Sequence, residues 1–359
     1  MSISEKQVLA ALSHVNDPDL NRDIVSLGFI KNLKISGGNI SLDINLTTPA
    51  CPVKDLLKSQ AEAEIRKISG VTSVAINMTA EVRRTVEPDK TNIAGIKNFV
   101  AVASGKGGVG KSTVAVNLAV AMAQAGAKVG LLDADIYGPT VPLMMGPEAQ
   151  IDMGPNDQII PTQAHGIKFM SMGFMAPGDK PLIWRGPMAH HALQQCLYQV
   201  MWGDLDYLFL DLPPGTGDVH LTLAQSVKLT GAVLVSTPQD IGLTISLKTY
   251  QMFKTTNVKI LGIIENMSYH ICTHCFEREE IFGHGGAEAA AKKLDIPFLG
   301  AIPLDIRIRA NADQGIPMVT ADPNSPISQT YKKIVQQLAS QVSIASYAAP
   351  SLQIVEEPA

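Results

Sequence analysis

The segment 105–113 combines the residue types that a phosphate-binding loop needs. It reads Gly-Lys-Gly-Gly-Val-Gly-Lys-Ser-Thr and fits the pattern G-x-x-x-x-G-K-[ST]. Glycines let the backbone wrap closely around an anion, and the N-terminus of a following helix adds partial positive charge. In this pattern Lys111 reaches the β- and γ-phosphates, and the Ser112 hydroxyl holds Mg²⁺. The sequence therefore predicts a nucleotide-phosphate site formed by Gly105, Lys106, Gly107, Gly108, Val109, Gly110, Lys111, Ser112 and Thr113.

The residues on both sides of this loop have the pattern of a strand followed by a helix. Residues 99–104 are an apolar run typical of a buried parallel strand, and 113–124 read as a helix that Gly126 closes. Apolar segments then alternate with helical ones along the chain. This alternation predicts an α/β P-loop fold, in which helices flank a mostly parallel sheet with strands at 98–103, 128–132, 206–211, 231–236, 259–264 and 298–302.

The first 83 residues have the pattern of a separate, small α+β module. A capping box at Ser4 and Gln7 precedes a short amphipathic helix, and alternating apolar residues around Gly37 and Gly38 predict a hairpin. Pro52 suits the first turn of a second helix. We therefore expect a small domain at 1–83, a linker at 84–96, a larger domain at 97–342 and a flexible tail at 343–359.

Two acidic segments are expected at the same edge of the sheet as the phosphate loop. Asp133 and Asp135 follow one predicted strand, and Asp211 ends another. Ligands bind at the carboxyl ends of strands in open α/β sheets, and carboxylate oxygens suit Mg²⁺ or its waters. The alternative for each aspartate is a structural role as a strand-end or capping residue.

Three residues that follow two later strands could contact a nucleotide base. They are Asn266, Pro303 and Asp305. An asparagine amide offers both a donor and an acceptor to the edge of an adenine ring. A turn-forming role remains the alternative for Asn266 and Asp305.

The composition excludes several classes of protein. Hydrophobic residues make up 46% of the 359 residues and charged residues 17%, which indicates a filled core, and the length suggests about two domains. The formal net charge of −4, without a basic block, argues against a nucleic-acid partner. We expect a cytoplasmic protein without a membrane partner, because the chain shows no signal-peptide pattern, no apolar run long enough to span a bilayer and only four cysteines.

Lys106 is a second lysine in the loop, and an ordinary phosphate loop does not need it. With it, residues 106–112 resemble the deviant phosphate loop of the MinD/ParA/nitrogenase-iron-protein class. The resemblance implies an ATP-linked homodimer in which Lys106 reaches the partner's nucleotide, so that hydrolysis depends on assembly. It also implies that Asp135 positions the attacking water and that Asp211 is the Walker B carboxylate. In this class the residues matching Asn266 and the Pro303–Asp305 loop contact adenine. The alternative for Lys106 is a solvated surface lysine.

The segment Cys272-Thr-His-Cys275 offers two thiols at a spacing that can bind one soft metal or one edge of a cluster. A thioredoxin-like redox pair is one interpretation, although the segment does not open a helix as such pairs do. A shared [4Fe–4S] cluster is favoured, because two cysteines per chain become four in the implied dimer. The remaining interpretation is a mononuclear zinc site completed by His270, His274 or His284.

The other two cysteines have different surroundings. Cys51 precedes Pro52 at an expected helix N-terminus, where the helix dipole would stabilise a thiolate and allow a transient role in cluster transfer. A small buried apolar residue is the equally plausible interpretation of Cys51. Cys196 lies among apolar residues at helical spacing and is expected in the core.

Several longer segments resemble the bacterial Mrp/ApbC iron–sulfur carrier family. The resemblance covers about residues 5–340, and residues 46–52 resemble the small iron–sulfur-assembly-type domain fused to many of these carriers. One departure is Thr273, where many members have proline. The segments that carry the resemblance are 133–140, 184–188, 265–275 and 281–286.

This resemblance implies a homodimer that binds a labile [4Fe–4S] cluster through Cys272 and Cys275 of both chains. The cluster would pass from assembly scaffolds to apo iron–sulfur proteins, with slow ATP hydrolysis in which Lys106, Lys111 and Asp135 act. One alternative is a spatial-organising ATPase of the MinD or ParA kind with a structural zinc site, but the acidic end of the chain lacks the basic amphipathic tail that it would need. A metal chaperone with a vestigial ATP site is another alternative.

Overall fold

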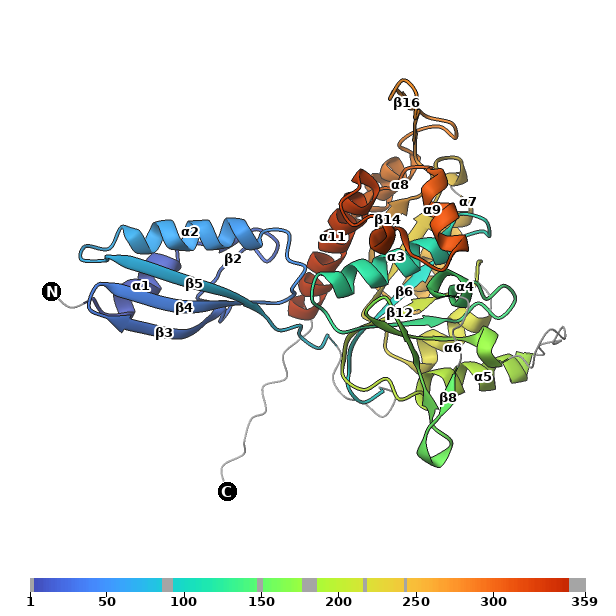
Figure 1. Ribbon diagram of the computed structural model, residues 1–359, viewed down its shortest axis with the longest axis horizontal. Coiled ribbons are helices and arrows are strands. Elements are labelled where there is room, and N and C mark those ends of the chain that lie inside the picture. The colour runs from blue at the N-terminus through green and yellow to red at the C-terminus, as the bar shows by residue number, and fades with distance from the viewer. Residues whose placement is uncertain are drawn as a thin grey trace. The chain divides into compact units, whose positions relative to one another are not determined.

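The computed structural model describes residues 3–85, 93–146, 151–175, 186–215, 218–241 and 244–348 (Figure 1). The chain divides into two compact units, one formed by Met1–Thr85 with Ala339–Ala359 and the other by Val86–Leu338. Most of the predicted linker, at 86–92, lies outside the described residues. So do Trp184 and Arg185, which belong to one of the segments used for the family resemblance.

The smaller unit is built on a three-stranded sheet in the order β3-β4-β5. Strand β4 (Asn39–Leu46) pairs antiparallel with β3 (Ile30–Ser36) and parallel with β5 (Ser73–Ala80). The helices are α1 (Glu5–Leu12) and α2 (Lys54–Arg66), and β1 (Asn16–Asp17) pairs with β2 (Arg22–Asp23). The predicted capping box is present at the start of α1, since Gln7 N–H donates to Ser4 Oγ over 3.3 Å and Ser4 N–H donates to Gln7 Oε1 over 2.9 Å.

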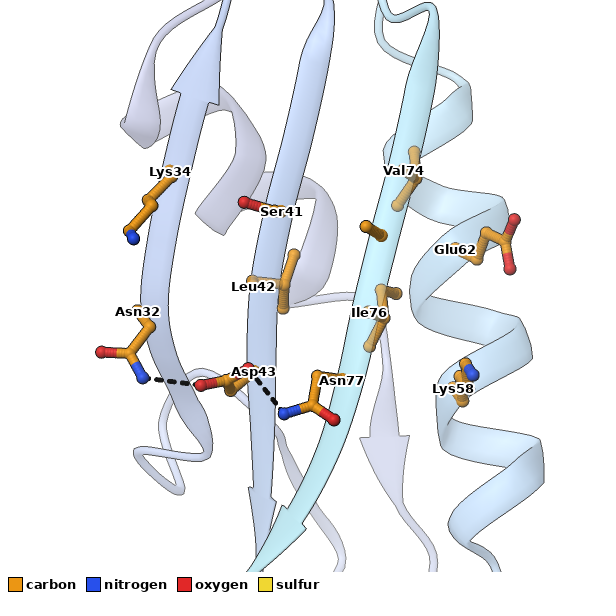
Figure 2. A pocket seen from close by; sticks show the side chains of 11 residues that line it. Asn32, Lys34, Ser41, Leu42, Asp43, Lys58, Glu62, Val74, Ile76 and Asn77 are labelled. Atoms are coloured by element: carbon orange, nitrogen blue, oxygen red, sulfur yellow. Dashed lines mark hydrogen bonds between the residues drawn. The ribbon is translucent and has the colours of Figure 1, made fainter.

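The two faces of this small sheet differ sharply in polarity. Alternate side chains of β4, such as Leu42 and Ile44, are buried with apolar residues of α1 and α2 in one core. On the opposite face Asp43 accepts hydrogen bonds from the Asn32 amide (2.6 Å) and the Asn77 amide (3.1 Å) (Figure 2). These three residues form part of the lining of a cavity of about 610 Å³, to which Lys58 and Glu62 of α2 also contribute. These hydrogen bonds hold the pKa of Asp43 below its usual range. The strand period of two thus gives one apolar face and one polar face.

The larger unit contains an eight-stranded sheet in the order β10-β11-β7-β12-β6-β13-β14-β17. Every pairing is parallel except that of β10 with β11. The expected parallel α/β sheet is confirmed. Strand β11 was not predicted from the sequence. The strands are β6 (Ile96–Ala103), β7 (Val129–Asp133), β10 (Thr162–Ala164), β11 (Ile167–Ser171), β12 (Leu205–Asp211), β13 (Gly231–Ser236), β14 (Ile260–Glu265) and β17 (Phe298–Ala301).

Helices cover both faces of this sheet. Figure 1 shows α3 on one side of the sheet and α5 and α6 on the other, and α3 is buried along most of its length. The helices are α3 (Lys111–Gln124), α4 (Val141–Met145), α5 (Gly186–Tyr198), α6 (Asp218–Ser226), α7 (Thr244–Thr255), α8 (Gly286–Leu294), α9 (Ile306–Asp313), α10 (Met318–Ala321) and α11 (Pro326–Ala348). Two small hairpins pair β8 (Asp152–Met153) with β9 (Ile159–Ile160) and β15 (His270–Ile271) with β16 (Arg278–Glu279).

The final helix is longer than the sequence predicts. A flexible tail was expected from residue 343, but α11 continues to Ala348, and residues 349–359 lie outside the described residues. Two contacts hold this last part of the helix. Ser343 Oγ accepts a hydrogen bond from Thr47 Oγ1 over 2.9 Å, and the Arg83 guanidinium lies 4.3 Å from the centre of the Tyr347 ring. Within the described residues, no helix is both long and apolar enough to cross a membrane.

Replacement of Gly231 by alanine is expected to destabilise the sheet. A Cβ atom at this position would lie 2.7 Å from the Lys259 carbonyl oxygen and 2.6 Å from Leu261 Cγ, so backbone would have to move. Overpacking of this kind costs about 1–3 kcal/mol. The matched control is Gly138→Ala, where a Cβ meets nothing within 4 Å. Urea unfolding followed by tryptophan fluorescence measures both variants, and equal midpoints would contradict the expectation.

Candidate nucleotide and cysteine sites

The predicted phosphate loop connects β6 to α3. Gly108 has φ 82° and Gly110 has φ 76°, a left-handed conformation that favours glycine. Gly110 is the N-cap of α3, which begins at Lys111, two residues earlier than predicted. The loop backbone therefore lies at the N-terminus of a buried helix, where its N–H groups suit an anion.

Lys111 forms a buried ion pair at the edge of the sheet. Its side chain is 6% exposed, and its Nζ lies 2.5 Å from Asp211 Oδ1 and 3.2 Å from Ser112 Oγ. Burial raises the pKa of Asp211, and the Lys111 ammonium opposes this rise. Asp211 Oδ2 is buried and forms no hydrogen bond among the residues that the structure describes. A buried carboxylate oxygen near the Ser112 hydroxyl is a donor set that fits Mg²⁺.

A second buried carboxylate lies on the neighbouring strand. Asp133 of β7 is the register partner of Asp211 of β12. Burial, together with the Asp211 charge, raises the pKa of Asp133 to about 7. Ser171 Oγ donates to Asp133 Oδ2 over 2.9 Å, a contact that the sequence did not suggest because β11 was not predicted. At neutral pH the negative charge of these two carboxylates is therefore reduced in two ways, by partial protonation and by the Lys111 ammonium.

Asp135 lies close to this pair but is only half-buried. Its Oδ1 accepts hydrogen bonds from the N–H groups of Tyr137 (3.2 Å) and Gly138 (3.3 Å). Its charge also contributes to the raised pKa of Asp211, which places the two carboxylates near each other. The structure thus brings Lys111, Ser112, Asp135 and Asp211 to one end of the sheet.

The three residues predicted to contact a base line one cavity of about 410 Å³. Gly110 and Thr113 of the phosphate loop line the same cavity. Asn266 Nδ2 donates to the Val109 carbonyl over 2.8 Å, which joins the end of β14 to the phosphate loop. The sequence missed the apolar walls, which α4 and α9 supply. The lining residues include Leu143, Met144, Asn266, Pro303, Asp305 and Ile308.

The volume and lining of this cavity suit a planar ligand. Cavities that bind small molecules are commonly about 300–1,000 Å³ and mostly apolar, with a few polar groups. Asp305 is not free to turn into the cavity, because it caps α9 through Arg307 N–H (2.9 Å) and its Oδ2 accepts from the Arg307 guanidinium (2.8 Å). These bonds lower the pKa of Asp305. Asp305 therefore fixes the loop that forms one wall.

Cys272 and Cys275 occupy the turn between β15 and β16, which projects beyond α8 and α9 in Figure 1. Cys272 N–H donates to the Glu277 carbonyl over 2.9 Å, and Phe276 N–H donates to the Cys272 carbonyl over 2.9 Å. Cys272 is half-buried and Cys275 exposed. The N–H groups of Cys275 and His274 lower the pKa of Cys272, which favours the thiolate that binds metals.

Two of the three histidines considered for a zinc site have their Nδ1 atoms in contact with other groups. His270 Nδ1 lies 3.0 Å from the Leu304 carbonyl oxygen. His284 Nδ1 lies 3.2 Å from the Arg278 guanidinium and 3.1 Å from Glu280 Oε1. Across the described ranges, no group of three or more His, Cys, Asp or Glu side chains is placed to hold a metal ion.

The expectation of a stabilised thiolate at Cys51 is wrong. Burial raises the pKa of Cys51 to about 11 and outweighs the Val53 N–H group that lowers it. Helix α2 begins only at Lys54, so Pro52 lies outside the first turn in which it was expected and Cys51 is three residues before the helix. Its side chain packs against the core of the smaller unit, and Cys196 is fully buried in the larger unit, as predicted.

Gly215, four residues after Asp211, has φ 92° and donates from its N–H to the Ser104 carbonyl over 3.0 Å. The next two residues, 216 and 217, lie outside the described residues.

Comparison with known proteins gives consistent matches for both units. Residues 95–339 match the ParA family, described as NUBPL iron-transfer P-loop NTPase, and residues 5–77 match a family described as iron–sulfur cluster assembly protein. An iron–sulfur cluster carrier protein of Synechocystis sp. is 46% identical over 94% of this chain and 98% of its own length.

Two solved structures resemble the larger unit. One is a nucleotide-binding protein of Archaeoglobus fulgidus in complex with ADP, 40% identical with a TM-score of 0.56 over 66% of this chain and 91% of that one. The other is the septum site-determining protein MinD of Pyrococcus horikoshii with Mg-ADP, 25% identical with a TM-score of 0.50 over 66% of this chain and 94% of that one.

Replacement of Lys111 by methionine is expected to destabilise the protein more at pH 8 than at pH 5.5. Asp133 and Asp211 have pKa values that are raised in the folded state. Their contribution to the free energy of unfolding is therefore greatest below about pH 4, where both are protonated, and it falls as the pH rises through the folded-state pKa values. At pH 8 the Lys111→Met variant leaves the two carboxylates next to each other in a buried site without the cation that neutralises them. Breaking a buried pair costs about 3–5 kcal/mol, and protonation at pH 5.5 relieves part of this cost.

The matched control is Lys97→Met, which breaks a partly exposed pair between Lys97 Nζ and Asp206 Oδ1 at 2.9 Å. Its expected cost is below about 1 kcal/mol at both pH values. Thermal unfolding at pH 5.5 and pH 8 gives the comparison. An equal loss at both pH values for Lys111→Met would show that the carboxylates do not depend on this cation.

Proposed function

Because the chain belongs to the iron–sulfur cluster carrier family of ParA-type P-loop NTPases, we propose that two copies hold one [4Fe–4S] cluster between them and pass it to apo iron–sulfur proteins. The family and the P-loop fold expected from the sequence are confirmed. Cluster-assembly scaffolds supply the cluster in this proposal. The observation that carries it is the pair of accessible thiols at the end of a projecting hairpin.

The hairpin of β15 and β16, with Cys272 and Cys275 in its turn, is called the cysteine hairpin below. It offers half of the ligands that a cubane cluster needs. A [4Fe–4S] cluster takes four thiolates, and each chain supplies Cys272 and Cys275. The lowered pKa of Cys272 supports binding, since the thiolate is the ligand. Exposed apolar side chains of the same hairpin, among them Phe276 with 77% exposure, favour association with a second copy because their burial removes apolar surface from water.

The nucleotide site supports binding of ATP with Mg²⁺. The Archaeoglobus relative is in complex with ADP, and its likeness covers the unit that contains the phosphate loop. In the proposed complex Lys111 contacts the β- and γ-phosphates, Ser112 and Asp211 hold Mg²⁺ or its waters, and Asn266 lies beside the base. Mg²⁺ supplies neutralisation of the phosphate charge. Asp135 orients the attacking water.

Lys106 is the second lysine of the phosphate loop. It is exposed at the phosphate loop, where its carbonyl accepts a hydrogen bond from Ser104 Oγ over 2.9 Å. In the proposed dimer its ammonium reaches the partner's nucleotide and stabilises charge on the transferring phosphoryl group. Hydrolysis is then slow in the separate chain and depends on assembly.

Anaerobic reconstitution with iron and sulfide is expected to give a brown dimer. The shared site predicts about four irons per dimer and a thiolate-to-iron absorption band. Both signals should disappear in Cys272→Ser/Cys275→Ser. The matched control is Cys51→Ser, which should keep both signals, because burial holds the Cys51 thiol in its neutral form. Wild-type protein that stays colourless and binds zinc alone would overturn the carrier proposal.

Mixing two inactive variants is expected to restore ATP hydrolysis if Lys106 acts across the interface. Lys106→Ala removes the cation given to the partner, and Asp135→Ala removes the residue that orients water in the chain's own site. In a mixed dimer one site keeps both groups. An equal mixture should therefore recover about a quarter of the wild-type rate, since half of the dimers are mixed and each has one complete site.

Phosphate release by each variant alone and by the mixture gives the measurement. A mixture that remains as inactive as its components would show that Lys106 acts within its own chain.

A further inference from the structure

Three hydrogen bonds join residues 268–270, at the start of the cysteine hairpin, to residues 302–304, which lead into one wall of the base cavity. Ser268 N–H donates to the Ile302 carbonyl over 2.9 Å, and Leu304 N–H donates to the Tyr269 carbonyl over 2.7 Å. His270 Nδ1 lies 3.0 Å from the Leu304 carbonyl oxygen. A carbonyl can only accept, so Nδ1 of His270 carries the proton.

His270 is the outermost of these attachments. Among the described residues, His270 makes the one hydrogen bond that joins the segment 270–284 to another part of the chain. The other hydrogen bonds of this segment, such as that between Arg278 and His284, connect residues within it. Strands β15 and β16 are two residues long, and such a hairpin has little stability of its own. Arg278 of β16 also contacts the Tyr269 ring, 4.2 Å from its centre. Together with this contact, the His270 hydrogen bond sets the orientation of the two cysteines.

The other end of this contact lies in the wall of the base cavity. Leu304 lines the cavity between Pro303 and Asp305. Asp305 ties this loop to α9 by capping its N-terminus, and Ile308 of α9 lines the cavity as well. A ligand that contacts this wall moves or fixes the loop together with α9, and the Leu304 carbonyl moves with the loop.

Two hydrogen bonds to Glu265 hold the residues on either side of the segment 270–284, so that movement of the loop changes the position of the hairpin alone. Glu265 Oε1 accepts a hydrogen bond from Ser268 Oγ over 2.5 Å, and Glu265 Oε2 accepts one from Ala287 N–H over 2.8 Å. One buried carboxylate thus contacts Ser268 and Ala287, which lie before and after the segment that contains the cysteines. Beyond Ser268, Tyr269 and His270 both contact Leu304 in the cavity wall, and the His270 contact is the one that lies within the hairpin.

We propose that His270 is a positioning residue through which occupancy of the base cavity sets the arrangement of Cys272 and Cys275. This inference rests on the proposed function, in which nucleotide and cluster sites act together, and it names the contact that links them within one chain. The bond from Nδ1 to the Leu304 carbonyl is the element that responds to the nucleotide.

The test measures thiol reactivity in cluster-free protein with and without saturating ADP. Iodoacetamide labelling of the Cys272–Cys275 segment is followed by mass spectrometry, at a concentration where light scattering gives the same mass in both conditions. In the wild type, ADP is expected to change the labelling rate by about fivefold, within the usual range of coupling between sites. In His270→Ala this ratio should fall close to one, while ADP affinity by calorimetry stays within about twofold.

Three further variants separate the hydrogen bond from a general structural role. His270→Asn keeps a donor at the position of Nδ1 and should retain the ADP effect, whereas His270→Gln places its amide near the position of Nε2 and should lose it. His284→Ala removes a histidine whose contacts stay within the segment 270–284 and should retain the effect.

An ADP effect that persists in His270→Ala, is absent from the wild type, or is lost equally in His270→Asn would overturn the inference. The thiols carry no cluster in this assay. A failure to reconstitute iron would therefore count against the carrier proposal and leave the labelling result standing.

Discussion

The ion pair between Lys111 and Asp211 fixes the relation between the phosphate loop and the sheet. Asp211 and Asp133 are register partners at the ends of adjacent parallel strands, so two carboxylates are buried side by side. Buried charges are costly unless they are paired or protonated. Lys111, the first residue of α3, supplies the cation, and a raised pKa near 7 lets Asp133 hold a proton. The N-terminus of α3 is thereby held at the edge where strands β7 and β12 end.

The end of β14 connects this site to the cysteine hairpin through two consecutive residues. Glu265 holds both ends of the segment that contains the cysteines, and Asn266 bonds to the Val109 carbonyl of the phosphate loop. The loop after β17 adds the second connection, since Leu304 both lines the base cavity and bonds to the hairpin. Parallel topology explains this arrangement, because the carboxyl ends of β6, β12, β14 and β17 meet at one edge.

Local motifs were predictable from the sequence, and contacts between distant elements were not. The loop at 105–113 and the strand-ending Asp211 carry their signal in consecutive residues, and the structure places both at the sheet edge. The cavity walls from α4 and α9, and the contact of Ser171 with Asp133, depend on which elements become neighbours. The pKa of Cys51 also could not be predicted from neighbouring residues alone. Its position near a helix start suggested a lowered pKa, yet burial, which depends on tertiary packing, dominates.

A weakly held hairpin suits a cluster that is cargo rather than a resident cofactor. A structural metal site gains stability when its ligands are buried and rigid, but release then has a high barrier. Here Cys275 is exposed, and β15 and β16 are too short to be stable alone. Segments of low local stability are the ones that move when a ligand binds elsewhere. Because the anchoring frame at Glu265 is buried while the thiols are accessible, the proposed carrier can change the geometry of its cluster ligands without disturbing the core that binds the nucleotide.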